Sequence, residues 1–329
     1  MSDRIWITWE NQRRSRELAT FFGCKLFVIT ATGILRYPKC VYRTLVVLVL
    51  SRPRVVFAQN PSMVLATIVV LWSKVSNAVA IVDRHTTFLL NRRNRLTPWL
   101  VVFRLMHWFT LRYANITIVT NEHLAQLVRE QRGNPVVLPD RLPSLTRSNA
   151  REFPIDRRKK NVLLISSFAE DEPIAAVVSA MSLIGSPKEV HLYVSGRVKS
   201  SFAGLVANAP SNITFTNYLT EDDYISLLLH VDVVMALSTS DHTMLCGCYE
   251  AVAAEKPLVT SDKAVLREYF TAALFADSSS EGIAVALDAA LAESERRREM
   301  MRKLKADIGP SWSTEAKRLD RLVDAMSTR

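Results

Sequence analysis

Residues 233–262 have the sequence VVMALSTSDHTMLCGCYEAVAAEKPLVTSD. An apolar run of strand length opens this stretch, a loop rich in Ser, Thr and Asp follows, and small residues with helical spacing continue to Ala254. Another short apolar run, Pro257–Thr260, has the length of a second strand. A strand, a polar loop, a helix and a further strand in this order predict a parallel sheet covered by helices.

The same alternation extends through the second half of the chain. Short apolar runs alternate there with longer segments of helical spacing. The expected strands are Asn161–Ser166, Glu189–Ser195, Asn212–Asn217, Asp232–Leu237, Pro257–Thr260 and Ala273–Ala276. The expected helices are Ile174–Leu183, Ser200–Asn208, Glu221–His230, Gly247–Ala254 and Ala264–Phe270.

The first half repeats this rhythm before a polar linker, Ser144–Lys160. Its expected strands are Arg4–Trp9, Lys25–Thr30, Arg54–Gln59, Ala78–Val82, Ile116–Thr120 and Pro135–Leu138, and its expected helices are Gln12–Phe22, Lys39–Leu50, Ser62–Val75, Pro98–Tyr113 and Glu122–Gln131. We therefore predict two tandem doubly wound α/β domains, residues 1–145 and 155–310, with a cleft between them. A C-terminal helix of about residues 312–329 is expected to pack back on the first domain.

Length and composition fit two such domains. A chain of 329 residues exceeds the size to which one hydrophobic core usually grows. Its 49% hydrophobic and 22% charged residues exclude a disordered or low-complexity chain. The four cysteines have neither a disulfide framework nor zinc-ligand spacing, which favours a reducing, cytosolic compartment. The longest apolar stretch, Met63–Trp72, is far shorter than the roughly 20 residues of a membrane-spanning helix, and the first residues lack the apolar core of a secretory signal.

The charge differs between the halves. Residues 1–150 carry 21 Lys and Arg residues against 7 Asp and Glu residues, a formal charge of +14. Residues 151–329 carry 21 against 25, a formal charge of −4. This asymmetry predicts that the two domains face different partners and that the first faces something anionic.

The stretch quoted first suits the binding of a phosphorylated ligand. Ligands of doubly wound sheets bind beyond the carboxyl ends of the strands, where the free N–H groups of a helix such as the one starting near Gly247 point at one spot. Glu250 lies about one turn further along, where its carboxylate could accept two hydrogen bonds from a ribose diol. Helix capping by Asp241 and Thr243, with Glu250 in solvent, is the alternative explanation.

This passage resembles the donor-site signature of GT-B glycosyltransferases, especially the group 1 or family 4-like enzymes of bacterial surface polysaccharide assembly. In those enzymes a helix bearing Glu-Ala-small-Ala, here Glu250-Ala251-Val252-Ala253, binds a nucleotide sugar together with a following Pro-Leu/Val-Val strand, here Pro257-Leu258-Val259. The resemblance extends in order over most of the chain. The other matching motifs are Trp9-Glu10, Arg13-Arg14-Ser15, Leu18-Ala19, Asp83-Arg84-His85, Val119-Thr120-Asn121, Val137-Leu138-Pro139-Asp140 and Ser167-Phe168-Ala169-Glu170-Asp171-Glu172-Pro173.

The resemblance implies a nucleotide-sugar donor site in the second domain. The expected donor-binding residues are Ser167, Arg197, Lys199, Tyr218, Asp241, His242, Thr243, Met244, Gly247 and Glu250. His242 stands where the pattern has a glutamate, so we expect it to contact the diphosphate or a sugar hydroxyl. The usual Arg and Lys after the first strand of this domain are missing, so Arg197 and Lys199 are the expected cations. These two departures leave open whether transfer retains or inverts the anomeric configuration.

Tyr218 follows a strand at the place where similar enzymes recognise the nucleobase. A packed aromatic side chain at a strand end is the alternative for this residue.

Asp83 and His85 end an apolar run of the first domain with polar side chains. Either could accept the proton of an acceptor hydroxyl as its oxygen bonds to the sugar. Asp83 is the preferred base, because it directly ends the strand, and His85 is expected to orient the hydroxyl. A helix cap and a loop hydrogen bond are the alternative roles.

The loop after the first strand carries Glu10, Arg13 and Arg14 in place of a glycine-rich turn. The guanidinium group of an arginine can donate two parallel hydrogen bonds to phosphate oxygens, so this loop is expected to bind the phosphates of a lipid-diphosphate acceptor. A solvated basic face is the alternative. The chain has no Gly-x-Gly-x-x-Gly or Walker motif, which argues against dehydrogenases and P-loop enzymes. No metal is expected, because capping explains the close acidic sets Glu170–Glu172 and Glu221–Asp223.

A cluster of arginines, Arg92, Arg93 and Arg95, precedes a helix that contains Trp99 and Trp108. Basic residues beside tryptophans are typical of an anchor on an anionic membrane surface, and packing of this helix on the sheet is the alternative.

The sequence thus favours a peripheral enzyme at the cytoplasmic face of the plasma membrane. It would be a hexosyltransferase that moves a sugar from a nucleotide sugar to a lipid-linked glycan, without further cofactor, in exopolysaccharide, capsule or O-antigen assembly. A hydrolysing sugar-nucleotide epimerase is the alternative enzyme. A basic nucleic-acid-binding protein is the alternative from another class, but no nucleic-acid-reading module is present, so nucleic acid is not an expected partner.

Overall fold

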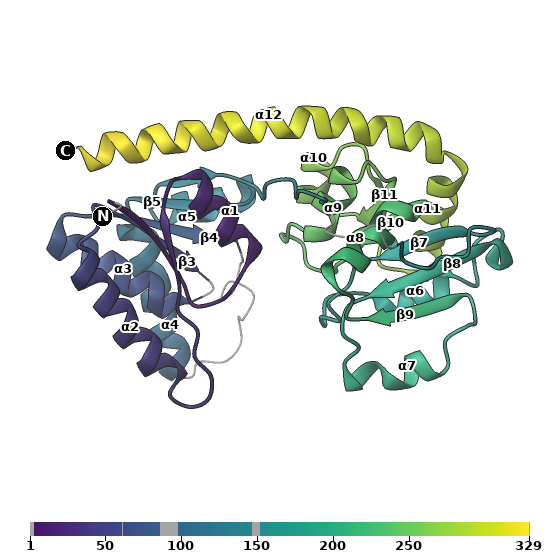
Figure 1. Ribbon diagram of the computed structural model, residues 1–329, viewed down its shortest axis with the longest axis horizontal. Coiled ribbons are helices and arrows are strands. Elements are labelled where there is room, and N and C mark those ends of the chain that lie inside the picture. Colours follow the sequence, from purple (N-terminus) through teal and green to yellow (C-terminus); the bar gives the residue numbers. More distant parts are fainter. Residues whose placement is uncertain (1–2, 61, 86–97, 147–151, 329) are drawn as a thin grey trace. The chain divides into compact units, whose positions relative to one another are not determined.

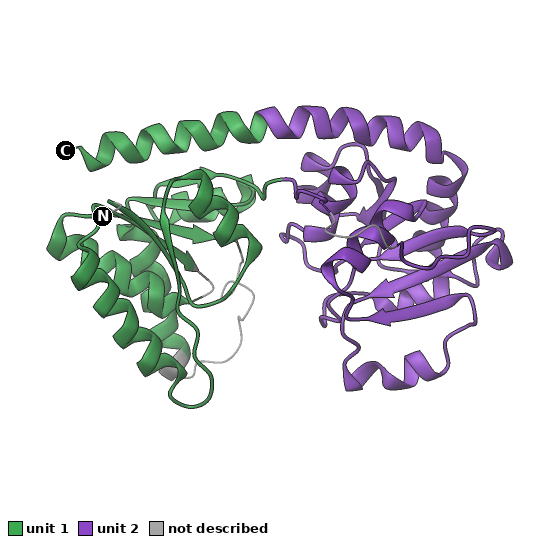
Figure 2. Ribbon diagram, viewed as in Figure 1, with its two compact units in different colours: residues 1–141, 311–329 green, residues 142–310 purple. Residues whose placement is uncertain are grey.

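The computed structural model describes residues 3–60, 62–85, 98–146 and 152–328 (Figure 1). The chain forms two compact units, which Figure 2 colours separately. Unit 1 consists of residues 1–141 and 311–329, and unit 2 of residues 142–310. The predicted doubly wound α/β fold is confirmed, because each unit contains a parallel six-stranded sheet with helices on both faces.

The unit 1 sheet has the strand order β2-β1-β3-β4-β5-β6. Its strands are β1 (Arg4–Thr8), β2 (Lys25–Val28), β3 (Val55–Asn60), β4 (Val79–Arg84), β5 (Ile116–Val119) and β6 (Pro135–Val137). The connecting helices are α1 (Arg13–Phe21), α2 (Arg36–Ser51), α3 (Met63–Ser76), α4 (Pro98–Tyr113) and α5 (Glu122–Glu130). The order of the strands reverses between β1 and β3, and ligands of such sheets bind at the carboxyl ends of the strands beside this point.

Two cores cover the faces of the unit 1 sheet. Alternate strand residues such as Ala80 and Val82 pack with α2 and α3 on one face, and Val79 and Ile81 pack with α1 and the C-terminal helix on the other. Strands buried on both faces need apolar residues at every position, which explains the continuous apolar runs of the sequence.

The unit 2 sheet has the order β12-β11-β10-β7-β8-β9, which reverses between β7 and β10. Its strands are β7 (Lys160–Leu164), β8 (Val190–Ser195), β9 (Ile213–Asn217), β10 (Val233–Ala236), β11 (Leu258–Ser261) and β12 (Leu274–Ala276). Its helices are α6 (Ile174–Ala180), η1 (Pro187–Glu189), η2 (Ser200–Phe202), α7 (Ala203–Ala207), α8 (Glu221–His230), α9 (Cys246–Ala253), α10 (Ala264–Tyr269), α11 (Ser280–Ala292) and the start of α12 (Ser294–Ser327). Helices α6 and α11 pack on one face, and α8, α9, α10 and α12 pack on the other.

Helix α12 begins in unit 2 and ends in unit 1. Its side chains Met301, Leu304 and Ile308 are buried in unit 2, whereas Trp312, Ala316, Leu319 and Val323 are buried in the core of unit 1. In unit 1, Arg4 at the start of β1 donates a 2.6 Å hydrogen bond to Asp320 of this helix. None of the helices in the described ranges has the length and apolarity needed to span a membrane.

Candidate functional site

In unit 2 the loops that follow β7, β10 and β11 are tied together beside the point where the strand order reverses. The backbone N–H of Thr239 donates to the backbone oxygen of Asp171 at 2.7 Å, and the Ser238 hydroxyl donates to the Asp171 carboxylate. Lys263 after β11 donates to Asp241 after β10 at 2.7 Å, and this contact lowers the pKa of Asp241. The polar loops at this edge of the sheet therefore form one connected cluster.

Glu250 lies on α9, directly after this cluster. Its carboxylate accepts a hydrogen bond from the hydroxyl of Tyr224 on α8, so a neighbouring helix helps to orient it. Glu250 is partly exposed, unlike Ala251 and Val252 beside it, which are buried in the core. The contact with Tyr224 was not predicted, since residues 26 positions apart on two helices show no pattern in the sequence.

Gly247 allows α9 to lie against the sheet. A Cβ atom at this position would lie 2.8 Å from the Cβ of Ala236 on β10 and 3.1 Å from the Cβ of Ile165. Both distances are below ordinary van der Waals contact, so this close approach requires glycine. The packing of α9 therefore explains the glycine at position 247 without any role in ligand binding.

Ser167 belongs to a loop that wraps around a carboxylate of its own chain. Glu172 accepts hydrogen bonds from the backbone N–H groups of Ser167 and Ala169, at 3.0 and 3.2 Å, and from the hydroxyls of Ser166 and Ser167, at 2.7 and 2.8 Å. The prediction that helix capping explains this acidic set is wrong for Glu172, because helix α6 has no side-chain cap and the carboxylate binds the preceding loop instead. The N–H groups of Ser167 and Ala169 already donate to this carboxylate.

The other expected donor-binding residues lie around the same edge of the sheet. Arg197 and Lys199 follow β8 and are exposed, and Tyr218 follows β9 with 79% of its surface exposed. The exposure of Tyr218 contradicts the alternative of a packed aromatic. Thr243 shares a 2.7 Å hydrogen bond with Ser240, His242 is partly exposed, and Met244 packs partly into the core.

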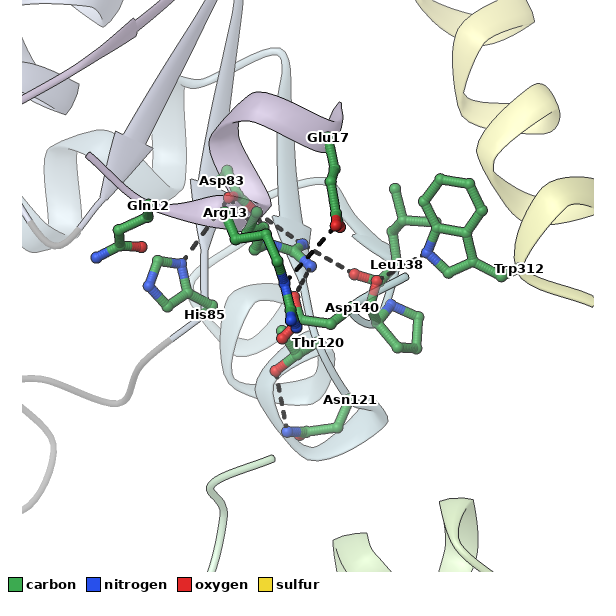
Figure 3. A network of polar contacts seen from close by, with 12 residues as sticks. Gln12, Arg13, Glu17, Asp83, His85, Thr120, Asn121, Leu138, Asp140 and Trp312 are labelled. Carbon is green, nitrogen blue, oxygen red and sulfur yellow. Dashed lines mark hydrogen bonds and ion pairs between the residues drawn. The ribbon is translucent and has the colours of Figure 1, made fainter. Parts of the chain in front are cut away.

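In unit 1, Arg14 forms the centre of a buried ion-pair network at the carboxyl end of the sheet. Figure 3 shows its partners Asp83, Leu138 and Asp140. Its Nε lies 3.0 Å from Oδ2 of Asp83 and its Nη1 lies 2.6 Å from Oδ1 of Asp140. Its Nη2 donates to Asp83 and to the backbone oxygen of Leu138, each at 2.9 Å. Burial disfavours the charge of Arg14, but the carboxylates of Asp83 and Asp140 raise its pKa.

These contacts contradict the expectation that Arg14 grips the phosphates of an acceptor. The Arg14 side chain is 8% exposed, and all three of its guanidinium nitrogens already donate to protein oxygens. A bound phosphate would have to displace a carboxylate that compensates this buried charge. Arg14 therefore has a structural role in fixing Asp83.

The surroundings of Asp83 also contradict its role as the general base. The side chain is completely buried, and although burial raises the pKa of this carboxyl group, the charge and hydrogen bonds of Arg14, together with the nearby imidazole of His85, lower it to about 2. A carboxylate with so low a pKa is a poor proton acceptor near neutral pH. His85, whose side chain is 18% exposed and whose Nδ1 lies 3.8 Å from Oδ2 of Asp83, is the better placed of the two.

Glu10 and Arg13 lie at the same end of the sheet and are less buried than Arg14. Glu10 accepts hydrogen bonds from Gln12 at 3.0 Å and from Arg36 at 3.3 Å. Arg13 pairs with Glu17 at 3.6 Å along α1. Both side chains keep exposed surface, 45% for Glu10 and 36% for Arg13, so contact with an acceptor is compatible with their positions.

Strand β4 ends in Arg84, a residue of the Asp83-Arg84-His85 motif for which the sequence predicted no role. Arg84 points to the α3 and α4 side of the sheet, opposite to Asp83, and its Nη1 lies 2.7 Å from Nδ1 of His107. Burial lowers the pKa of Arg84 to about 10. Burial of an arginine cannot be recognised from its neighbours in the sequence, since it depends on α4 packing over the strand.

Of the residues expected at a membrane surface, Arg92, Arg93 and Arg95 lie outside the described residues, and Trp99 is placed only as part of α4. Trp108 on the same helix is 46% exposed. Within the described part of the chain, no three His, Cys, Asp or Glu side chains lie close enough together to hold a metal ion.

Part of the chain matches one known protein family, and several solved structures resemble the chain in fold. Residues 146–307 match the sequence model of the family described as glycosyl transferases group 1. No curated protein matches the chain in sequence.

Three solved structures resemble the chain over nearly its whole length. The Anabaena protein HepE in complex with UDP and glucose is 12% identical, with 98% of this chain and 92% of that chain covered and a TM-score of 0.74. Sucrose-phosphate synthase from Thermosynechococcus elongatus is 15% identical over 92% of this chain and 83% of that chain, with a TM-score of 0.72. WaaG, a glycosyltransferase involved in lipopolysaccharide biosynthesis, is 11% identical over 97% and 99% of the two chains, with a TM-score of 0.71.

Proposed function

We propose that this chain, whose fold is GT-B and whose residues 146–307 match the group 1 family, is a glycosyltransferase that moves a hexosyl group from a nucleotide sugar to a lipid-linked glycan. The observation that supports a nucleotide-sugar donor site is the connected loop cluster of unit 2. This cluster lies beside Glu250, within the residues that match the family. Structures of the similar protein HepE contain UDP, UDP with glucose, and UDP-glucose. A uridine diphosphate sugar is therefore the first donor to test.

In this proposal the diphosphate lies against the loops after β7 and β10, and the ribose hydroxyls donate to Glu250. The exposed side chains of Arg197 and Lys199 stabilise the charge that develops on the leaving diphosphate. Tyr224 positions the Glu250 carboxylate, and the exposed ring of Tyr218 stacks on the base.

Unit 1 supplies the acceptor side. The acceptor oxygen bonds to the anomeric carbon while the bond from that carbon to the diphosphate breaks, and the acceptor proton passes to His85. Asp83, held by Arg14, orients the imidazole of His85, a division of roles known from other carboxylate and histidine pairs. Glu10 and Arg13 contact the acceptor.

We also propose that the protein works at the cytoplasmic face of the plasma membrane, in exopolysaccharide, capsule or O-antigen assembly. The +14 charge of residues 1–150, the cluster Arg92, Arg93 and Arg95, and the tryptophans Trp99 and Trp108 support a membrane-facing first unit. The four cysteines form no disulfide within the described residues, which supports a reducing compartment.

Calorimetry with UDP-, GDP- and dTDP-sugars tests the donor site. We expect Glu250→Ala to weaken donor binding by about 1.5–3 kcal/mol, because it removes charged hydrogen bonds to the ribose, and Tyr224→Phe to have a smaller effect of the same sign. Glu268→Ala, which removes an exposed carboxylate from α10, is the matched control. Equal donor affinity in the parent and in Glu250→Ala would remove Glu250 from the site.

A further inference from the structure

Helices α2, α3 and α4 lie side by side on one face of the unit 1 sheet (Figure 1). They expose many large apolar side chains. Of the 19 large hydrophobic side chains that are exposed in the described residues, 14 lie between residues 34 and 113. Single exposed apolar residues are ordinary, but a set on three adjacent helices marks an interaction surface.

Helix α2 has one apolar stripe toward the sheet and a second one toward solvent. Cys40 and Leu48 are completely buried against the sheet. Tyr42, Leu45 and Val49, at positions i, i+3 and i+7, are 70%, 43% and 52% exposed. Packing within unit 1 explains the first stripe only, since the second contributes nothing to the core.

Helices α3 and α4 continue this surface. Leu71 and Val75 of α3 are 52% and 80% exposed, and Leu105 and Trp108 of α4 are 61% and 46% exposed. The two helices meet at the ring of Tyr113, which lies 5.8 Å from Nζ of Lys74. The exposed apolar side chains of α2, α3 and α4, together with Ile34 and Leu35 before α2, are called the three-helix surface below.

The charges on the three-helix surface have one sign. Helices α2, α3 and α4 contain no Asp or Glu residue, and between residues 18 and 121 the single acidic residue is Asp83, which is buried. Exposed lysines and arginines flank the apolar side chains, namely Lys39, Arg43, Lys74, Arg104 and Arg112. By contrast, the neighbouring helix α5 exposes the carboxylates Glu122 and Glu130.

This combination selects one kind of partner. An anionic bilayer accepts apolar side chains below its headgroups while its phosphates attract Lys and Arg. A second copy of the chain would place like charges opposite one another without carboxylates to compensate them. We propose that the three-helix surface docks unit 1 on an anionic lipid bilayer. This proposal names the surface of unit 1 that contacts the membrane. It rests on the proposed function only in assuming that the acceptor is linked to a lipid.

Vesicle flotation of the full-length protein without sugar substrates tests the inference. The vesicles consist of phosphatidylcholine that contains no phosphatidylglycerol, about 20% or about 40% phosphatidylglycerol, so that the anionic content increases in steps. Lys39→Gln, Arg43→Gln and Arg104→Gln in one chain are expected to weaken binding about fivefold for each charge removed. Tyr42→Gln, Leu45→Gln and Val49→Gln together are expected to weaken it by at least about tenfold at every anionic content.

Matched triple variants on other surfaces provide the controls. Leu183→Gln, Val285→Gln and Leu322→Gln remove exposed apolar side chains elsewhere, and Lys188→Gln, Lys317→Gln and Arg321→Gln remove exposed charges elsewhere. Both controls are expected to float like the parent, and so is Glu250→Ala, which separates docking from donor binding. The inference is overturned if the parent does not float on anionic vesicles or if the control triples lose as much binding as the surface triples. It is also overturned if the parent is a dimer that the Tyr42, Leu45 and Val49 substitutions dissociate.

Discussion

His85 and Asp83 are two residues apart, yet the fold gives them different chemistry. Asp83 is enclosed and paired with Arg14, whereas His85 keeps exposed surface at the end of β4. A proton acceptor must reach its substrate, which favours the partly exposed histidine, and the low pKa of Asp83 makes that carboxylate a poor acceptor near neutral pH.

Single-turnover sugar transfer at saturating donor separates the two residues. We expect His85→Ala to lower the rate of transfer by about a hundredfold or more with unchanged donor affinity, because proton removal matters in the transition state alone. Added imidazole should restore part of the rate, and His191→Ala in unit 2 should behave like the parent. A near-parental rate in His85→Ala would indicate that the donor phosphate accepts the proton, as in a retaining transfer.

Asp83 is expected to matter most for stability. Its folded-state pKa of about 2 lies below the ordinary 3.8, so the ionised carboxylate stabilises the fold above about pH 4. This stabilisation is lost as the pH falls from about 4 to about 2, where the carboxylate is protonated in the folded protein too. Asp83→Asn should lower the free energy of unfolding by about 3–5 kcal/mol at pH 7, because it leaves the Arg14 charge uncompensated.

Urea unfolding at pH 7 and at pH 3 checks this prediction. Asp3→Asn, which removes an exposed carboxylate near the same sheet, is the control and should change stability little. Equal stability of Asp83→Asn and the parent at pH 7 would mean that the Arg14 network contributes nothing.

At the scale of elements, the position of α9 against the sheet depends on the absence of a side chain at Gly247. A Cβ at Gly247 would come within 2.8 Å of Ala236, so we expect Gly247→Ala to destabilise unit 2 by about 1–3 kcal/mol and to weaken donor binding by shifting Glu250. Gly204→Ala on α7 is the control, since its Cβ would meet no atom within 4 Å. That substitution should be neutral or slightly stabilising in a thermal melt. If Gly247→Ala and Gly204→Ala changed the melting temperature equally little, α9 would be able to move away from β10.

The elements themselves could largely be predicted from the sequence. The twelve strands within the described residues were all expected, because residues buried on both faces of a parallel sheet give unbroken apolar runs. The expected GT-B fold is confirmed, and residues 146–307 match the expected group 1 family. Helix α2 starts at Arg36, before the predicted Lys39, because Pro38 is tolerated in the first turn of a helix.

Partners that are distant in the sequence could not be predicted. Arg14 and Asp83 are 69 positions apart, and nothing near Arg14 indicates that it is enclosed. The expectation of a phosphate-binding arginine failed for this reason. Helix α11 and the first half of α12 were also missed, and α12 continues through Pro310, a residue that usually ends or kinks a helix.

At the scale of the whole molecule, the two units differ in how their cores are built. The core of unit 2 comes from one continuous stretch, residues 142–310, whereas that of unit 1 is closed by the C-terminal part of α12. Trp312, Leu319 and Val323 pack there against Trp6, Leu18 and other residues of the first half of the chain. Unit 1 therefore reaches its full stability only when the last residues are in place.

Leu319→Ala tests this dependence of unit 1 on its C-terminal helix. Leu319 is completely buried in unit 1, so we expect the substitution to lower the free energy of unfolding of that unit by about 2–5 kcal/mol. Leu322→Ala on the same helix is the control, since Leu322 is 40% exposed and its loss should change stability by about 0.5 kcal/mol or less. Urea unfolding followed by tryptophan fluorescence reports on unit 1 through the buried side chains of Trp6 and Trp312. If both variants unfold at the parental urea concentration, the first 141 residues hold their core without α12. If Leu319→Ala alone shifts the midpoint, unit 1 is a single core built from both ends of the chain.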